Sequence, residues 1–217
     1  KHEANIMFLI QQANVRASEL KAAKAFGQEV RTVNEAANKR INNIEISAYA
    51  SPDGGLDLNS GLAEKRQDNT ASVVGRDLKK GKLDVAVDTR YTAEDWEGFQ
   101  ELVSKSNIQD KELILRVLSM YQDPEQREQE IKNISSVYKN LADEILPQLR
   151  RSRLTLNYEI IGKSDEEIAQ LADTDAKQLT VEELLYAATL TKDPAKKEAI
   201  YTKATQIYPN DFRAFNN

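Results

Sequence analysis

The sequence predicts a mixed α/β (α+β) fold: a β-α-β-α-β segment, a helical insertion, a last strand and a C-terminal helical hairpin. Three observations predict it. Short segments alternate apolar and polar residues with a period of two, as half-buried strands do. Longer segments between them space apolar residues three to four apart, which places those residues on one face of a helix. Gly (8) and Pro (5) are scarce and charged residues make up 30% of the chain, which favours a helix-rich soluble protein.

The first half of the chain contains the β-α-β-α-β segment. The two periodicities predict these elements in order: a strand at 5–11, a helix at 18–38, a strand at 44–50, a helix at 60–79 and a strand at 83–88. Asn42-Asn43 is predicted to separate the first helix from the second strand. Asp57 or Asn59 is the expected N-cap of the second helix, because short polar side chains accept hydrogen bonds from free N–H groups there.

The second half is predicted to be mainly helical. Asp123-Pro124-Glu125 combines a cap, a first-turn proline and an acid, and it predicts a helix that runs to about Ile145. Alternation predicts a fourth strand at 153–161, and the basic run at 150–153 is interpreted as its solvated start. Two capping boxes, Ser164-x-x-Glu167 and Thr180-x-x-Glu183, predict later helices. We therefore expect one domain at 1–162, with an insertion at about 90–149, and a helical segment at 163–217.

Composition excludes several function classes. A net charge of −5 argues against a nucleic-acid partner, which would need a basic surface. No apolar run approaches the ~20 residues of a transmembrane segment, and the absence of Cys excludes disulfide and thiol chemistry. The acids around Trp96 are typical of a first helical turn. We expect no enzyme, no cofactor and no metal site, because no base–nucleophile pair or metal-ligand spacing is present.

The most informative segment is a strand, a tight turn at Ser51-Pro52-Asp53-Gly54-Gly55, and a helix that carries Asn59, Leu62 and Arg66. Residues 4–161 resemble the OmpA-like peptidoglycan-binding domain, whose motif has an acid-containing loop followed by N-x-x-L-x-x-x-R on the next helix. The family separates its loop Asp from its Arg by fifteen residues, and 66 − 51 = 15 here. Ser51, however, stands where the family has Asp.

The resemblance implies a ligand site. In the family the helix arginine binds the carboxylate of diaminopimelate in the wall peptide, and the loop aspartate accepts from its ammonium group. By this resemblance Arg66 would bind the carboxylate, with Asn59, Ser51 and Gly54 shaping the pocket. Asp53 is the substitute acid, although its residue type and position also suit it to stabilising its own turn.

The resulting hypothesis is a non-catalytic module that attaches an envelope protein to peptidoglycan in the periplasm of a Gram-negative bacterium, at the outer membrane. The alternative is a degenerate OmpA-like domain that acts as an assembly scaffold. The tail resembles a tetratricopeptide (TPR) hairpin, with small residues at Ala187-Ala188 and with Tyr201, Ala204 and Pro209 at late positions. Such a unit needs neighbours to cover its apolar face, so other envelope proteins are the expected partners of the tail.

Overall fold

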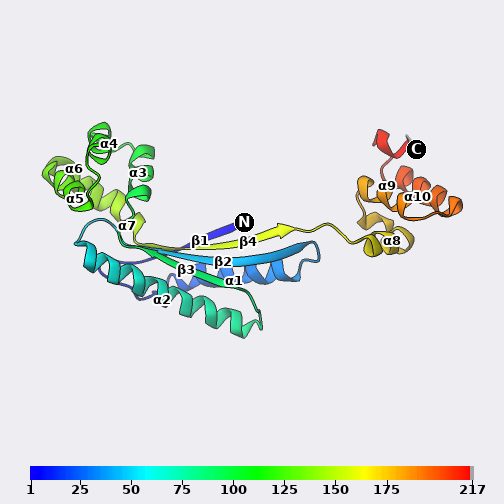
Figure 1. Ribbon diagram of the computed structural model, residues 1–217, viewed down its shortest axis with the longest axis horizontal. Coiled ribbons are helices and arrows are strands. Elements are labelled where there is room, and N and C mark those ends of the chain that lie inside the picture. Colours follow the sequence, from blue (N-terminus) through cyan, green and yellow to red (C-terminus); the bar gives the residue numbers. More distant parts are fainter. Residues whose placement is uncertain (216–217) are drawn as a thin grey trace. The chain divides into compact units, whose positions relative to one another are not determined.

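The computed structural model describes residues 1–215, with the backbone alone at 135–137, and it divides into two compact units, Lys1–Ile160 and Ile161–Asn217. The first unit contains a mixed four-stranded sheet with the order β1-β4-β2-β3, and the mixed α/β prediction is confirmed (Figure 1). Strands β2 and β3 are parallel, whereas β4 runs antiparallel to both β1 and β2. The last strand of the unit thus lies between its first two.

Four strands are present as predicted, but their ends differ, and the strand predicted at 83–88 shares only residues 87 and 88 with β3. The observed bounds are β1 (His2–Met7), β2 (Lys39–Tyr49), β3 (Val87–Thr92) and β4 (Arg151–Ile160). The prediction that Asn42-Asn43 precedes the second strand is wrong. Both residues belong to β2, where the pairing with β4 changes register between Ile41 and Asn43. A β-bulge absorbs one extra residue in this way and keeps the buried positions facing the same side.

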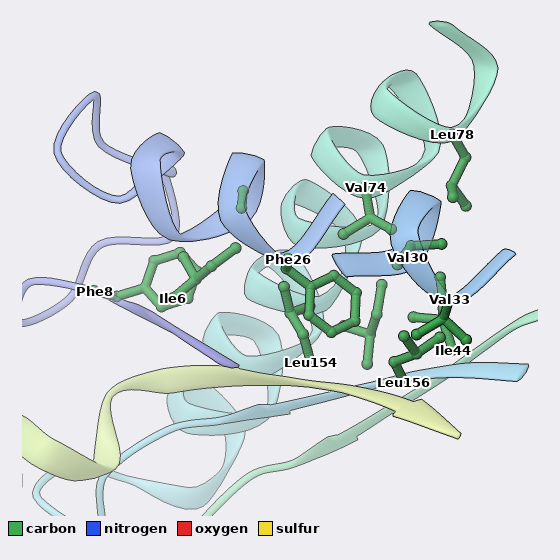
Figure 2. Close-up of a cluster of buried hydrophobic side chains, with 12 residues drawn as sticks. Ile6, Phe8, Phe26, Val30, Val33, Ile44, Val74, Leu78, Leu154 and Leu156 are labelled. Atoms are coloured by element: carbon green, nitrogen blue, oxygen red, sulfur yellow. The ribbon is translucent and has the colours of Figure 1, made fainter. Parts of the chain in front are cut away.

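Two helices, α1 (Leu20–Glu35) and α2 (Leu56–Lys80), cover one face of the sheet (Figure 1). Period-two side chains from β2 and β4 meet the apolar stripes of both helices there. Figure 2 shows this core, whose fully buried members include Ile6, Phe26, Val30, Val33, Ile44, Leu154 and Leu156. Helix α2 begins earlier than predicted, with Gly55 as its N-cap. The predicted cap at Asp57 or Asn59 is therefore wrong, because both residues lie inside the helix.

The expected insertion between β3 and β4 is helical. It comprises α3 (Trp96–Lys105), α4 (Lys111–Met120), α5 (Pro124–Asn133), α6 (Ser135–Asn140), a π-helical turn (Leu141–Ile145) and α7 (Leu146–Leu149). Asp123 caps α5 as predicted, but the expected continuous helix to Ile145 is interrupted at Ile134. The insertion has its own core around Phe99, Ile114, Leu141 and Leu149. It lies at the end of the sheet where α2 begins (Figure 1).

The second unit contains α8 (Asp165–Thr174), a 3₁₀ turn (Ala176–Gln178), α9 (Val181–Leu190), α10 (Pro194–Ile207) and a 3₁₀ turn at Phe212–Phe215. Both predicted capping boxes are present, at Ser164/Glu167 and Thr180/Glu183. Its core includes Leu179, Leu184, Ala188 and Ala204. The TPR likeness of this unit stays a prediction. In the described part of the chain, none of the helices has the length and apolar character that a bilayer crossing demands.

Candidate functional site

Residues 50–55, which contain the predicted ligand loop, connect the end of β2 to the start of α2. The alternation of β2 directs Ala48 and Ala50 into the core, so the loop begins from a buried anchor. Ser51 is only 3% exposed, and Pro52 is buried beside it. Asp53 and Gly54 are half-buried, and Gly55 is exposed. The loop is therefore a packed part of the molecule along most of its length.

Arg66 lies beneath this loop, on the third turn of α2, and is 0% exposed. Its Nε donates to the carbonyl of Gln12 (2.9 Å), Nη1 to that of Tyr49 (2.9 Å) and Nη2 to that of Leu9 (3.1 Å). The guanidinium also lies over the ring of Phe8, 5.1 Å from its centroid. Arg66 thus joins α2 to the end of β2 and to the segment after β1. Its contact with a ligand stays a prediction.

The charge of Arg66 is coupled to two neighbouring groups. The pKa of Arg66 is lowered to about 10, first by burial and then by the positive charge of Arg150, while the carboxylate of Asp53 acts in the opposite direction. Arg66 therefore remains a cation at neutral pH. These three side chains form a cluster of two guanidinium groups and one carboxylate.

Asp53 has a partner that sequence reasoning missed. Nη2 of Arg150 donates to Asp53 Oδ2 (2.8 Å), and Nε of Arg150 donates to the hydroxyl of Ser51 (3.2 Å). The Ser51 hydroxyl in turn donates to Asp53 Oδ1 (2.7 Å). Arg150 is 9% exposed and Arg151 is also buried, so the interpretation of residues 150–153 as a solvated strand start is wrong for these two residues. Their burial comes from the insertion and the loop, which no local pattern could reveal.

Asn59 forms hydrogen bonds with the loop and with the residues just before the insertion's first helix. Its Nδ2 donates to the carbonyl of Gly54 (2.8 Å) and to Oε1 of Glu94 (3.3 Å). The other oxygen of Glu94 accepts from the indole N–H of Trp96 (2.9 Å). A Cβ on Gly54 would lie 3.4 Å from Asn59 Oδ1, an ordinary van der Waals contact. Asn59 and Gly54 therefore tie the loop to the beginning of the insertion.

The insertion packs directly on the loop. The backbone N–H of Asp95 donates to the carbonyl of Ala50 (3.2 Å), and Asp95 Oδ2 lies 3.1 Å from Nη2 of Arg151 as an ion pair without hydrogen-bond geometry. Pro52 and Trp96 help to line a cavity of about 10 Å³ between loop and insertion. That volume is about one water-sized probe. The insertion thus covers the Pro52 side of the loop.

The acids near Trp96 have structural partners. Asp95 accepts from the backbone N–H of Gly98 (2.9 Å) and so caps α3, while Glu94 accepts from Asn59 and Trp96. Among the residues that the structure describes, no group of three or more His, Asp or Glu side chains could hold a metal ion. The charged groups gathered at the loop are the carboxylate of Asp53 and the guanidinium groups of Arg66 and Arg150.

Comparisons with known proteins return a distant match. No protein-family model matches the chain, and no curated protein sequence matches it. Among solved structures, the chain is similar to the OmpA-like domain of FopA1 from Francisella tularensis subsp. tularensis SCHU S4, with 13% identity and a TM-score of 0.39 over 75% of each chain.

Proposed function

We propose that residues 1–162 form a non-catalytic binding module of the cell envelope. The module attaches its protein non-covalently to peptidoglycan in the periplasm, at the outer membrane, through a peptide that contains diaminopimelate. One observation carries the proposal: a carboxylate and two guanidinium groups, those of Asp53, Arg66 and Arg150, converge on the loop that ends β2. A zwitterionic amino-acid end needs one anion and one cation at fixed separation, and arginine binds carboxylates through a planar fork.

The sequence-predicted residues take defined roles in this proposal. Asp53 accepts from the ligand ammonium, in place of the family aspartate that Ser51 replaces. The three bonds of Arg66 to backbone carbonyls use three of the five N–H donors of a guanidinium. The two other donors are the ones proposed for a ligand carboxylate, and they become accessible only if the loop moves, because Arg66 is fully buried. Asn59, Gly54 and Ser51 hold the loop in shape through their hydrogen bonds.

Sedimentation of the purified protein with isolated sacculi tests the proposal. Wild type is expected in the pellet, and Asp53→Asn, which removes the charge but keeps the shape, is expected in the supernatant. Truncating one partner of a buried charge pair costs ~2–5 kcal/mol of binding, which abolishes pelleting. Asp57→Asn is the matched control, since it removes an exposed acid from the same helix start. Equal pelleting of Asp53→Asn and wild type contradicts the role of Asp53.

A second candidate function is an assembly scaffold. It is favoured by the pairing of Asp53 with Arg150 and by the packing of the insertion on Pro52, because both contacts use loop residues for interactions within the protein. In this alternative the helical hairpin binds other envelope proteins and the sheet domain provides a rigid support. Wild type that stays in the supernatant with sacculi, while remaining folded by circular dichroism, favours the scaffold over wall attachment.

A further inference from the structure

Arg150 is held in place by its backbone as well as by its side chain. The preceding helix, α7, buries Leu146 and Leu149 in the core of the insertion. The carbonyl of Arg150 accepts from the backbone N–H of Phe8 (2.7 Å), which fixes the residue at the entrance to β4. Its guanidinium then reaches both Ser51 and Asp53. The insertion therefore delivers one cation to the ligand loop.

Arg150 also differs from Arg66 in what it donates to. Arg66 is fully buried and donates to three backbone carbonyls, which are neutral groups. Arg150 is slightly exposed and donates to a carboxylate and a hydroxyl, the two side chains at the positions where a ligand cation is expected. Within the described residues, Arg150 is therefore the guanidinium that a ligand of Asp53 has to meet.

We infer that Arg150 determines ligand specificity at this loop, and the inference rests on the proposed function. In the free protein its guanidinium forms an ion pair with the carboxylate of Asp53. A simple amine has to displace the guanidinium of Arg150 from Asp53 with a single ammonium group, and it offers Arg150 no new partner, which is unfavourable. A zwitterionic end offers an exchange: its ammonium group binds Asp53 while its carboxylate binds the guanidinium of Arg150. The loop thus selects an amino-acid end over a plain amine.

Two compounds distinguish binding of an amino-acid end from binding of a plain amine. Diaminopimelate carries an ammonium and a carboxylate at each end, and 1,5-diaminopentane is the same carbon skeleton without the carboxylates. The dissociation constants of both are measured on the full chain by calorimetry or by NMR titration. Wild type is expected to prefer diaminopimelate by at least about tenfold, the equivalent of one good charge-assisted contact.

Arg150→Met frees Asp53 and removes the partner of the ligand carboxylate. The preference is expected to fall to about threefold or less, mainly because the diamine binds more tightly to the unpaired carboxylate. Arg153→Met is the matched control: it removes a guanidinium from β4, the strand that follows Arg150, and Arg153 lies over the ring of Tyr49, 5.9 Å from its centroid. Its preference is expected to equal that of wild type. A loss of folding alone would weaken both compounds equally and leave their ratio unchanged.

The outcomes are distinguishable. If Arg150→Met keeps the wild-type preference for diaminopimelate over 1,5-diaminopentane, the inference is overturned. It is also overturned if wild type shows no such preference. In either case, pelleting of wild type with sacculi still supports the proposed function. Wild type and Arg150→Met that bind neither compound and do not pellet overturn both. If Arg150→Met does not fold, Arg150→Lys replaces it. Lysine keeps the charge without the fork, so the preference is expected to fall, and an unchanged preference overturns the inference.

Discussion

Arg66 shows how one residue satisfies both the motif and the fold. A buried cation is costly unless its donors are satisfied, and here two backbone carbonyls from the segment after β1 and one at the end of β2 satisfy three of them. Only arginine offers donors in a planar fork wide enough to reach three carbonyls at once. The motif position is therefore important for stability in this chain, independently of any ligand.

Replacing Arg66 by Met tests this structural role. The substitution leaves the carbonyls of Gln12, Tyr49 and Leu9 without their donors, and each lost bond costs ~1 kcal/mol. The free energy of unfolding in urea is expected to fall by about 3 kcal/mol. Arg76→Met on the exposed side of the same helix is the control and should change it by less than about 0.5 kcal/mol. Similar values for both variants would show that the three bonds do not stabilise the fold.

At the residue scale, part of the site could be predicted from sequence. The contact between Asn59 and the carbonyl of Gly54 is local, because it follows from a strand, a turn and a helix in sequence. Arg150 could not be predicted, because it meets Asp53 across 97 positions and only the docking of the insertion creates the contact. The expected cap role of Asn59 fails for a different reason: α2 begins at Leu56, and the Asn59 side chain reaches Gly54 and Glu94.

At the scale of elements, α1 and α2 approach each other closely at Gly27. A Cβ at this position would lie 1.9 Å from Oδ2 of Asp77 on α2. That carboxylate also forms an ion pair with Arg31 of α1, at 3.1 Å. The absence of a side chain at Gly27 therefore allows both the close approach of the helices and the ion pair.

Two glycine substitutions are expected to have opposite effects. Gly27→Ala displaces Asp77 and breaks its ion pair, so the free energy of unfolding should fall by about 1–3 kcal/mol. Gly75→Ala in α2 meets nothing within 4 Å, and alanine favours a helix over glycine by up to ~1 kcal/mol, so stability should rise. Urea unfolding of both variants measures the difference. A higher free energy of unfolding for Gly27→Ala than for wild type would show that α1 and α2 can move apart at this position without a loss of stability.

The capping box of α9 predicts a pH dependence. Burial favours the neutral form of Glu183, but the backbone N–H of Thr180 and the ammonium of Lys163 outweigh it, so the pKa of Glu183 lies below its ordinary value. A depressed carboxyl pKa stabilises the folded state above the ordinary value of 4.5, and this contribution is lost as the pH falls through the lowered pKa. Glu183→Gln removes the ionisable group, so the free energy of unfolding of this variant should fall less than that of wild type as the pH is lowered from 5.

Thr180→Ala removes the other half of the box at neutral pH. The hydroxyl accepts from the Glu183 N–H at 3.2 Å, and loss of an N-cap costs ~1 kcal/mol. Thermal unfolding followed by circular dichroism measures the change. Thr202→Ala inside α10 is the control: alanine is the better helix former there, so stability is expected to stay equal or rise slightly. Equal losses in both variants would show that the box contributes nothing specific.

The element ends show why sequence patterns were only partly sufficient. Both capping boxes and the Asp123-Pro124 start are local signals, and the structure confirms them. The start of β2 was placed too late because Asn42-Asn43 resembles a break, whereas pairing with β4 carries the strand through a bulge. The long helix predicted to Ile145 divides at Ile134, which nothing in its apolar spacing indicated.

At the scale of the whole molecule, the buried apolar residues form separate clusters for the sheet, the insertion and the helical hairpin. All proposed ligand groups, including Arg66, Asp53 and Arg150, belong to the unit Lys1–Ile160. The sheet core supports β2 and α2, which place the loop, and the insertion core supports Arg150. Wall binding should therefore depend on the first two clusters.

One substitution made in two different cores tests this assignment. Ile46→Asp buries an unpaired carboxyl in the sheet core, where residue 46 is fully buried, and Leu184→Asp does the same in the hairpin core. A buried carboxyl without a partner costs roughly 2–7 kcal/mol even in its protonated form, which is comparable to the ~5–15 kcal/mol stability of a domain, so each variant should unfold the unit that contains it. Circular dichroism reports the loss of structure, and pelleting with sacculi reports wall binding. We expect Leu184→Asp to pellet like wild type and Ile46→Asp to stay in the supernatant. If Leu184→Asp also stays in the supernatant, the hairpin is required for attachment, and wall binding cannot be assigned to the β2–α2 loop alone.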